Sequence, residues 1–506
     1  MKQCLDIISL IDSDYYKNNK RLKWHTSQLK YDEISQDIYF WLTSLELNEI
    51  EKEVFSLSCT FIYTELACYV THVYDYIILN ERNIRPKYSN KSNIFIKKIW
   101  CKQSITNTLL VDLERNHLEN TKIRTIYSLL VGLLPSRLFQ FISISRNPLA
   151  REYLVNNNFY LQVLPQYYFN INTKSSEFSQ QLSKKISATI IKNLEEDHFK
   201  LDKNHKQSIE FIVDTYISRA FNDLNKQDSL LKNKKAIITG TGNGYYNRLY
   251  SLLANKYNTT VIRFNHGGER CFFNDNYFWN FVELYNNDIY VTYGPKWGDF
   301  VRKKAKELNR DIGVKAIGSK YHKKFYDKFF GKKIYDKKKI LYIPNSFTGE
   351  IRIFPYAKLI DPILFDWQKY LIETLQKNGF EVIYKKHPKG FFQKNDELSK
   401  VASYESDKPM IKALEGVDMV LCDMAGSAFI ESLCAGKDIV LIDTCQRPFN
   451  LETKRDLQTA VKIVEAYWEN NTLKIDEKSL VNTFKNLDID DKNKDKIIQD
   501  YFLKTL

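Results

Sequence analysis

Short apolar runs alternate with helical stretches over the second half of the chain, and this alternation constrains the fold more than any other feature. Four runs lie at 236–239, 260–264, 289–293 and 314–317, with helical patterns at 246–256 and 296–308 between them. Four more lie at 340–343, 381–384, 419–421 and 439–442. Such alternation is typical of βαβ units with parallel sheets. The sequence therefore predicts an α/β protein with two Rossmann-like units in tandem.

The predicted domains follow the changes in this pattern. Residues 1–230 mostly show apolar spacing of three and four residues, so they are expected to form a mainly α-helical N-terminal region. The remaining expected parts are a first Rossmann-like unit at 231–325, a Lys-rich linker at 326–339, a second unit at 340–480 and a C-terminal tail helix at 481–506. Two such units leave a cleft between the carboxyl ends of their strands, where open α/β sheets bind ligands.

The net charge and the sequence motifs bear on the class of partner that this chain could bind. A net charge of +14 and a pI near 9.0 fit an anionic partner, and a generic Lys-rich surface explains them equally well. Nucleic acid is not expected, because no zinc-knuckle, helix-turn-helix or RNP-like signature is present. The eight cysteines never occur as C-x-x-C, which favours a reducing compartment without a disulfide framework.

Localisation is predicted from the apolar segments. The start of the chain lacks the pattern of a signal peptide, and no stretch of 18 continuous apolar residues occurs, so a cytoplasmic protein is expected. Residues 126–144 are apolar enough for an interfacial helix at the inner face of the membrane. A buried helix is the stronger interpretation of the same segment.

Gly426 and Ser427 follow the strand predicted at 419–421 and precede a helical stretch. Free N–H groups at a helix start favour a phosphate, and Ser427 adds a hydroxyl. Glu431 lies four residues on, so it shares a helical face with Ser427 and could accept hydrogen bonds from a ribose diol. The alternative is that Ser427 merely caps the helix and Glu431 is a solvated residue.

Two other strand ends of the second unit carry polar residues. Lys386, His387 and Pro388 follow the strand predicted at 381–384, and the proline holds His387 extended at the strand's end. A histidine beside lysines suits a leaving phosphate. Asn345 and Ser346 follow the strand predicted at 340–343 and add amide and hydroxyl groups, a weaker signal.

In the first unit, the turn after the strand at 260–264 is the candidate for acid–base chemistry. His266 and Glu269 flank Gly267 and Gly268, which would let the backbone approach a ligand. A structural turn with a satisfied histidine is the alternative. Residues 240–244 could cradle a phosphate but lack the full dinucleotide spacing. No P-loop, G-x-S-x-G or H-E-x-x-H motif is present, and neither a cofactor nor an essential metal is predicted.

These motifs together carry a family resemblance. They are Lys386-His387-Pro388, Asp423-x-x-Gly426-Ser427, Glu431-Ser432-x-x-Ala435-Gly436-Lys437 and a strand ending in Asp443. They resemble the C-terminal donor half of GT-B glycosyltransferases. The resemblance is closer to bacterial surface-carbohydrate transferases whose HP and Ser motifs hold CMP-activated donors, namely sialyl-, polysialyl- and Kdo-transferases and the related CDP-glycerol phosphotransferases. The His266-Gly267-Gly268 turn and residues 288–297 look like a family of transferases from surface-polysaccharide clusters. The resemblance covers roughly residues 235–450.

The resemblance implies a site and an activity. Lys386, His387 and Ser427 would hold the leaving phosphate of a nucleotide-sugar donor, Glu431 would contact the ribose, and His266 or Glu269 would act as base on a glycan acceptor. Glu269 stands where related sequences often have a small residue, and the second acidic motif of some sialyltransferases is not evident, which puts the base in doubt. The alternatives are a CDP-glycerol-type phosphotransferase, a UDP-sugar enzyme such as an epimerase, and a non-catalytic carbohydrate-assembly scaffold.

Overall fold

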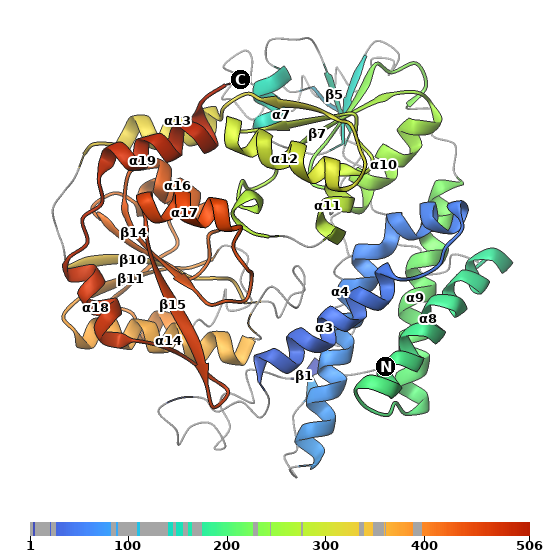
Figure 1. The fold of residues 1–506 in the computed structure, drawn as a ribbon, viewed down its shortest axis with the longest axis horizontal. Helices are drawn as coiled ribbons and strands as arrows, with labels where there is room; N and C mark the ends of the chain where they lie inside the picture. Colours follow the sequence, from blue (N-terminus) through green and yellow to red (C-terminus); the bar gives the residue numbers. More distant parts are fainter. Residues whose placement is uncertain are drawn as a thin grey trace.

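The structure is a computed structural model of the 506-residue chain. It describes residues 4–5, 21, 27–81, 88–89, 109–111, 140–144, 148–154, 160–163, 175–225, 231–242, 244–274, 277–332, 338–347, 359, 361–387 and 397–505. Two sheets and a group of long helices surround the middle of the molecule (Figure 1). The expected fold class is confirmed, since two Rossmann-like units follow an N-terminal helical region.

Four long helices dominate the N-terminal region: α3 (Gln28–Thr43), α4 (Glu49–Glu81), α8 (Glu177–Asp197) and α9 (Lys203–Leu224). Side chains of Ser27, Ser176 and Asp202 cap the starts of α3, α8 and α9 by accepting hydrogen bonds from backbone N–H groups. Within α4, residues 49–75 are long and apolar enough to cross a membrane by length and composition, but 72% of their most apolar window is buried inside the protein. That burial is typical of a core helix.

The first sheet has the strand order β3-β5-β4-β6-β7-β8-β9. Its strands are β3 (Leu109–Val111), β4 (Phe141–Ser143), β5 (Tyr160–Val163), β6 (Ala236–Thr239), β7 (Thr260–Phe264), β8 (Ile289–Thr292) and β9 (Gly313–Ala316). All neighbours pair in parallel except β3 and β5. Its helices are α7 (Pro148–Leu154), α10 (Tyr245–Lys256), α11 (Tyr277–Leu284), α12 (Pro295–Glu307) and α13 (Lys320–Phe329), with a short turn η4 (Arg270–Phe272).

Two expectations about the boundaries of this unit need correction. Strands β3, β4 and β5 belong to its sheet although they lie within 1–230, so that region is not only helical and the unit does not begin at 231. Strand β4 also occupies residues 141–143, where a helix was expected; residues 126–139 lie outside the described part. The expected linker at 326–339 begins inside α13, which extends to Phe329 because Phe325 and Phe329, one turn apart, are both buried.

The second sheet has the order β12-β11-β10-β13-β14-β15-β16. Its strands are β10 (Lys339–Ile343), β11 (Glu381–Lys385), β12 (Tyr404–Ser406), β13 (Met419–Cys422), β14 (Asp438–Asp443), β15 (Lys462–Glu469) and β16 (Thr472–Ile475). Only the β15–β16 pair is antiparallel. Its helices are α14 (Asp361–Lys377), α15 (Met410–Ala413), α16 (Ser427–Cys434), α17 (Leu451–Ala460) and α18 (Glu477–Lys485), and η6 is a short turn (Glu397–Lys400).

The end of the chain returns to the first unit. Helix α19 (Asp491–Ile498) continues into the π-helical segment η7 (Gln499–Leu503), near the carboxyl terminus in Figure 1. The carbonyl of Tyr501 accepts a 2.9 Å hydrogen bond from the backbone N–H of Gly294, and Thr505 forms a bridge with Ile317. Phe502 is fully buried and lies in an apolar cluster that also holds residues of both sheets. The two units therefore share one core.

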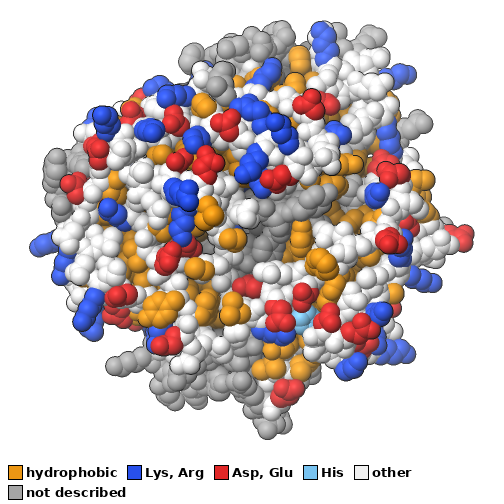
Figure 2. Space-filling view, viewed as in Figure 1, with side chains coloured by type: hydrophobic (Ala, Val, Ile, Leu, Met, Phe, Trp, Pro, Cys, Tyr) orange, Lys and Arg blue, Asp and Glu red, His pale blue; other side chains and the backbone are white. Residues whose placement is uncertain are grey.

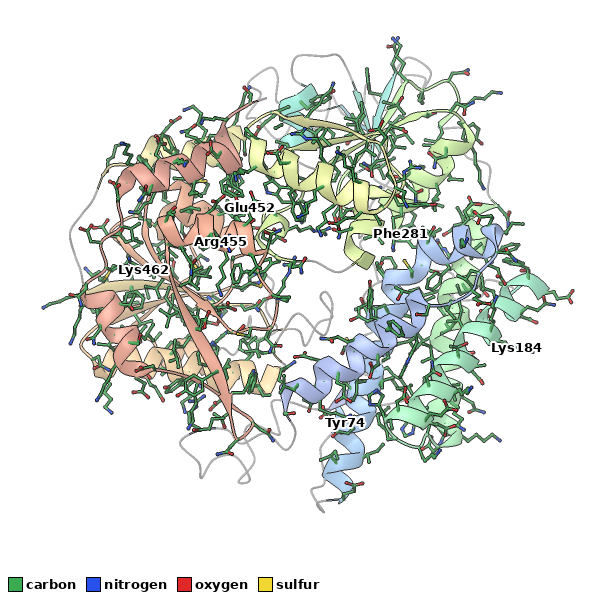
Figure 3. The ribbon with its side chains drawn as sticks, in the orientation of Figure 1. Tyr74, Lys184, Phe281, Glu452, Arg455 and Lys462 are labelled. Atoms are coloured by element: carbon green, nitrogen blue, oxygen red, sulfur yellow. The ribbon has the colours of Figure 1, made fainter. Side chains whose placement is uncertain are left out.

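The helical region contacts both units. Phe281, on α11, packs against the cores of the first unit and the helices, and Tyr74, on α4, packs against the cores of the helices and the second unit (Figure 3). Arg21 also donates to the Asp366 carboxylate across 2.8 Å. On the face in Figure 2, Lys and Arg side chains are interspersed with Asp and Glu, so the excess positive charge forms no single patch on that face.

Candidate functional site

The carboxyl ends of β10, β11, β13 and β14 form one edge of the second sheet. The register places Tyr342 opposite Tyr384, and Ile343 opposite Cys422, so these strands end at similar heights. Because the strands are parallel, the residues that follow them lie along the same edge. This edge carries the predicted donor residues Asn345, Ser346, Lys386, His387, Gly426, Ser427 and Glu431. Pro388 lies outside the described residues.

The start of α16 has no side-chain cap. Gly426 is the N-cap residue, and Ser427 is the exposed first residue of the helix, so the alternative that Ser427 is the cap is wrong. Helices α13 and α17 also follow strands and are capped by the side chains of Ser319 and Asn450, whereas α10 and α12 start at Gly244 and Gly294 without a side-chain cap. The first N–H groups of α16 thus have no side-chain cap among the described residues, and an anion suits them.

Glu431 is half-buried and faces two groups from other elements. The Tyr321 hydroxyl, on α13, donates to Oε1 of Glu431 across 2.6 Å. Burial raises the pKa of Glu431, while the Tyr321 hydrogen bond and the charge of Lys385 oppose that rise. Burial lowers the pKa of Lys385, against the attraction of Asp407 and Glu431. The predicted ribose contact is therefore not a freely solvated carboxylate.

At the end of β11, Lys386 is partly neutralised. Its ammonium lies 3.3 Å from the Glu405 carboxylate, which comes from the neighbouring strand β12. The backbone N–H of Lys386 donates to the carbonyl of Ser406 and so continues the sheet ladder to the last residue before His387. His387 is half-buried at the edge. The sheet ladder therefore fixes the Lys386–Glu405 pair immediately before the predicted histidine.

The His266 turn of the first unit touches α16 of the second. Gly267 and Gly268 have φ of 84° and 83°, and a Cβ on Gly268 would lie 3.1 Å from Cδ1 of Ile430. The carbonyl of Gly268 accepts a 3.0 Å hydrogen bond from the indole N–H of Trp297. Residues with a side chain rarely adopt such φ values, which explains why both positions are glycine. The turn thus brings His266 and Glu269 to the junction of the units.

The two predicted bases differ in their surroundings. His266 is exposed at the tip of the turn. Glu269 bends back over the turn, and its Oε2 is buried without a hydrogen-bond partner among the described residues. Both residues belong to the turn that contacts α16.

Glu152, on α7, joins this junction and was not predicted. Its carboxylate accepts hydrogen bonds from the backbone N–H groups of Lys320 (2.8 Å) and Tyr321 (3.1 Å) at the start of α13. Burial raises the pKa of Glu152, and these two hydrogen bonds oppose the rise. Burial also raises the pKa of Tyr293, with further contributions from Glu269, Glu152 and Tyr321. Two carboxylates of the first unit therefore act on one tyrosine, and no local motif marks Glu152.

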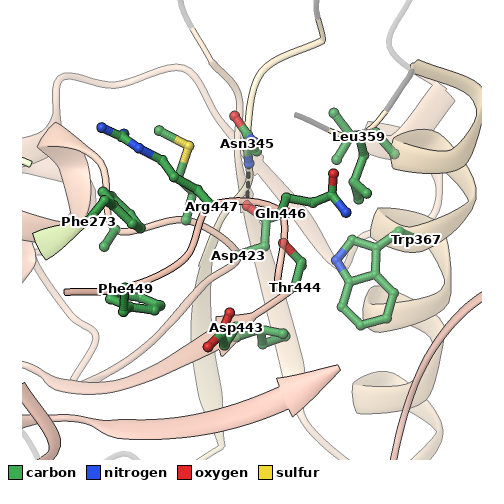
Figure 4. Close-up of a pocket in the computed structure, with 14 residues that line it drawn as sticks. Phe273, Asn345, Leu359, Trp367, Asp423, Asp443, Thr444, Gln446, Arg447 and Phe449 are labelled. Carbon is green, nitrogen blue, oxygen red and sulfur yellow. Dashed lines mark hydrogen bonds between the residues drawn. The ribbon is translucent and has the colours of Figure 1, made fainter. Parts of the chain in front are cut away.

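A cavity of about 490 Å³, including its part open to solvent, lies at the ends of β10, β13 and β14 (Figure 4). Asn345 and Asp423 lie in its wall, and the Asn345 backbone N–H donates to Asp423. The Tyr342 hydroxyl donates to the same carboxylate across 2.8 Å. Burial raises the pKa of Asp423 to about 7, although these bonds oppose it. Phe273 of the first unit closes one side, with the Arg447 guanidinium 4.0 Å above its ring.

Ser346 supports the Asn345 side chain through its backbone. The side chain is buried, and its backbone N–H donates to Oδ1 of Asn345 across 2.9 Å. This bond holds the Asn345 side chain against the loop. The structure therefore assigns Asn345 to the cavity wall and Ser346 to its support.

Among the described residues, one group of side chains could hold a metal ion. Glu33, Asp37 and His198 place ligand atoms within 4.8 Å of one another in the helical region, away from the sheet edges. The Lys30 ammonium lies 2.9 Å from Oε1 of Glu33 and 3.3 Å from Nδ1 of His198. The Lys30 ammonium thus already supplies a positive charge where a metal ion would bind.

Two Rossmann-like units with a shared core, and a tail that returns to the first unit, make this a GT-B-like α/β protein. No protein-family model matches the sequence, and no curated protein matches it. Among solved structures, a protein from Listeria monocytogenes assigned as a UDP-N-acetylglucosamine 2-epimerase is similar, with a TM-score of 0.37 and 10% identity, over 71% of this chain and 91% of that one. A likeness of that strength carries no argument about chemistry.

Proposed function

We propose that this chain is a glycosyltransferase that transfers a sugar from a nucleotide-activated donor to a bacterial surface glycan. The donor is a CMP-sugar, such as a nonulosonic acid or Kdo. One observation carries the proposal: the uncapped start of α16 lies one helical turn before Glu431, which interacts with Lys385 at the end of β11. An anion site and a partly buried carboxylate at this spacing suit a nucleotide phosphate and its ribose diol.

The leaving phosphate would bind at Ser427 and the first N–H groups of α16. Lys386 and His387 would stabilise the charge that develops on it, and His387 could also donate a proton. Because Glu405 already pairs with Lys386, His387 would carry the larger share. Neither a metal nor a cofactor is part of this proposal.

The acceptor hydroxyl would enter beside the His266 turn, with His266 or Glu269 as base. The turn abuts α16, so a base there would be close to a donor bound at Ser427. Exclusion of water matters because hydrolysis of the donor competes with transfer. A lipid-linked acceptor would place the protein at the inner face of the membrane.

Isothermal titration with CMP, CDP, UMP and UDP tests the donor site. We expect selective binding of CMP, weakened at least about tenfold in His387→Ala and in Ser427→Ala, since each removes a hydrogen bond to a charged group. Ser208→Ala, on α9 in the helical region, is the matched control and should bind as the wild type does. Absence of binding by any of the four nucleotides would overturn the assignment.

The alternatives give other outcomes. Preference for UDP would point to a UDP-sugar enzyme, and an epimerase would consume no net donor. Release of CMP from CDP-glycerol, with no reaction of CMP-sugars, would identify a phosphotransferase. If His387→Ala fully restored surface glycan in a strain lacking the protein, the non-catalytic scaffold would replace the enzyme.

A further inference from the structure

Two buried polar atoms face the cavity at the ends of β10, β13 and β14 without hydrogen-bond partners. Trp367, on α14, is fully buried, and its indole N–H has no acceptor among the described residues. Oε1 of Gln446 is likewise buried and has no donor there. Both residues line the same cavity (Figure 4). Because buried polar groups are nearly always hydrogen-bonded, this donor and this acceptor mark a place where a ligand can bind.

The orientation of the Gln446 amide is fixed from outside the cavity. Its side chain forms a hydrogen bond with the carboxyl group of Asp32, on α3. Burial raises the pKa of Asp32 to about 7. The same carboxyl group also accepts a hydrogen bond from Nε2 of Gln28 across 2.9 Å. The hydrogen bond from Gln446 lowers the pKa of Asp32 against its burial, so Gln446 donates its N–H₂ to this carboxyl group and its carbonyl oxygen remains for another donor. The helical region therefore supports one wall of the cavity.

The cavity also has an apolar wall. Leu359, Leu364 and Ile442 line it, and each is at most 4% exposed. An acetamido group matches this combination: its carbonyl accepts from Trp367, its N–H donates to Gln446, and its methyl group packs on the aliphatic side chains. A hydroxyl has fewer atoms and would leave both the apolar wall and the fully buried Trp367 N–H without a contact.

The cavity adjoins the proposed phosphate site. Residues Asp423, Met424 and Ala425 line it, and the next two along the chain are Gly426 and Ser427 at the start of α16. Glu431 lies on the far side of the phosphate site along the same chain. A donor with its phosphate at Ser427 and its ribose at Glu431 would therefore direct its sugar towards the cavity.

We propose that this cavity binds the acetamido group of an N-acetylated sugar and so selects it over sugars that carry a hydroxyl at that position. This inference rests on the proposed function, because it uses the phosphate position at Ser427. It makes Trp367 and Gln446 specificity-determining residues, and it favours an N-acetylated nonulosonic acid over Kdo.

The test compares donors that differ only at this group, by calorimetric titration of the full chain. The first pair is CMP-N-acetylneuraminate and CMP-ketodeoxynonulosonate, in which a hydroxyl replaces the acetamido group; UDP-N-acetylglucosamine and UDP-glucose form a second pair. We expect the acetamido donor of the recognised pair to bind about tenfold more tightly, the value of one buried hydrogen bond with its apolar contact. Trp367→Phe keeps the ring and removes the N–H, so it should abolish most of that preference and leave binding of the free nucleotide unchanged.

Trp468→Phe, on β15 and not among the residues that line the cavity, is the matched control and should keep the preference. Thermal unfolding of each variant shows whether it is folded. The proposal is overturned if the wild type binds both members of the recognised pair equally, or if Trp367→Phe weakens the free nucleotide and both donors alike. Absence of binding by CMP and UDP alike would instead reject the proposed function, and with it this inference.

Discussion

The Tyr321 hydroxyl lies 2.6 Å from Oε1 of Glu431 and joins α13, the helix that leaves the first unit, to α16 of the second. The backbone N–H of the same tyrosine donates to Glu152, so one residue connects α7, α13 and α16. Burial and the Glu431 carboxylate raise the pKa of Tyr321, which keeps it a hydrogen-bond donor at neutral pH. The position of Glu431 therefore depends on both units.

Glu431→Gln is expected to weaken CMP binding about tenfold, because a neutral amide loses the charge-assisted hydrogen bonds to the ribose, worth about 1.5 kcal/mol. The fold should tolerate the change, since burial already disfavours the charged form of Glu431. Calorimetric titration with CMP measures the effect, and Glu373→Gln, in an exposed 3.8 Å pair with Lys369, is the control. Equal affinities in the two variants would contradict the ribose assignment.

Asp423→Asn should become progressively less destabilising, relative to the wild type, as pH rises. The folded protein holds the Asp423 proton with a pKa of about 7, above the ordinary value of 3.8. This group therefore stabilises the fold below about pH 4, and that contribution is lost as pH rises through 7. The difference in unfolding free energy should shift by a few kcal/mol between about pH 4 and pH 8. Urea unfolding at both pH values measures it; a constant difference would mean that Asp423 is ionised throughout.

Gly268→Ala should destabilise the protein more than Gly379→Ala does. Both glycines have φ near 85°, but a Cβ on Gly379 has no atom within 4 Å, whereas one on Gly268 meets Ile430 at 3.1 Å and Tyr293 at 3.2 Å. Gly379→Ala therefore measures the backbone strain alone, about 1 kcal/mol. The excess in Gly268→Ala, read from urea unfolding of both variants, reports the close contact with Ile430 of the second unit and with Tyr293. Equal costs would show that the turn can move away from α16.

Phe502→Ala is expected to cost about 3–5 kcal/mol of unfolding free energy, because it empties a fully buried site. Its ring lies 5.5 Å from that of His322 and 6.2 Å from that of Phe272, centre to centre. Tyr467→Ala, at a side chain that is 50% exposed, is the control and should cost little. A cost below about 1 kcal/mol in urea unfolding would mean that the tail adds little to the shared core.

The alternation of apolar runs predicted the strands of both sheets from β6 to β11, and also β13 and β14. A strand buried on both faces needs a continuous apolar run, which fits these strands except β9, which lies at a sheet edge and is mostly exposed. The ends differ by a residue: β9 covers Gly313–Ala316 where 314–317 was predicted. Strands β3, β4 and β5 could not be predicted. They are three or four residues long, and their neighbours in the sheet lie far away in the sequence.

The residues of the candidate site likewise fall into those that sequence patterns could predict and those that they could not. Asn345, Ser427 and Glu431 follow parallel strands, so a rule about strand ends brings them to one edge without any knowledge of tertiary packing. Glu152, Tyr321, Trp367 and Gln446 have no such rule, since each takes its place from tertiary contacts between elements that lie far apart in the sequence. Sequence patterns report the period of a strand or helix, and they carry little information about which faces meet.

The return of the tail means that the polypeptide passes between the units twice, through α13 and through α19 with η7. These crossings lie together, because η7 contacts α13 and the ring of Phe502 lies beside that of His322. Two adjacent covalent connections act as a hinge, because they permit rotation about the line that joins them and resist sliding. Any opening of the inter-unit edge to admit a ligand is thereby restricted to a swing about this seam, with the largest displacement at the opposite rim.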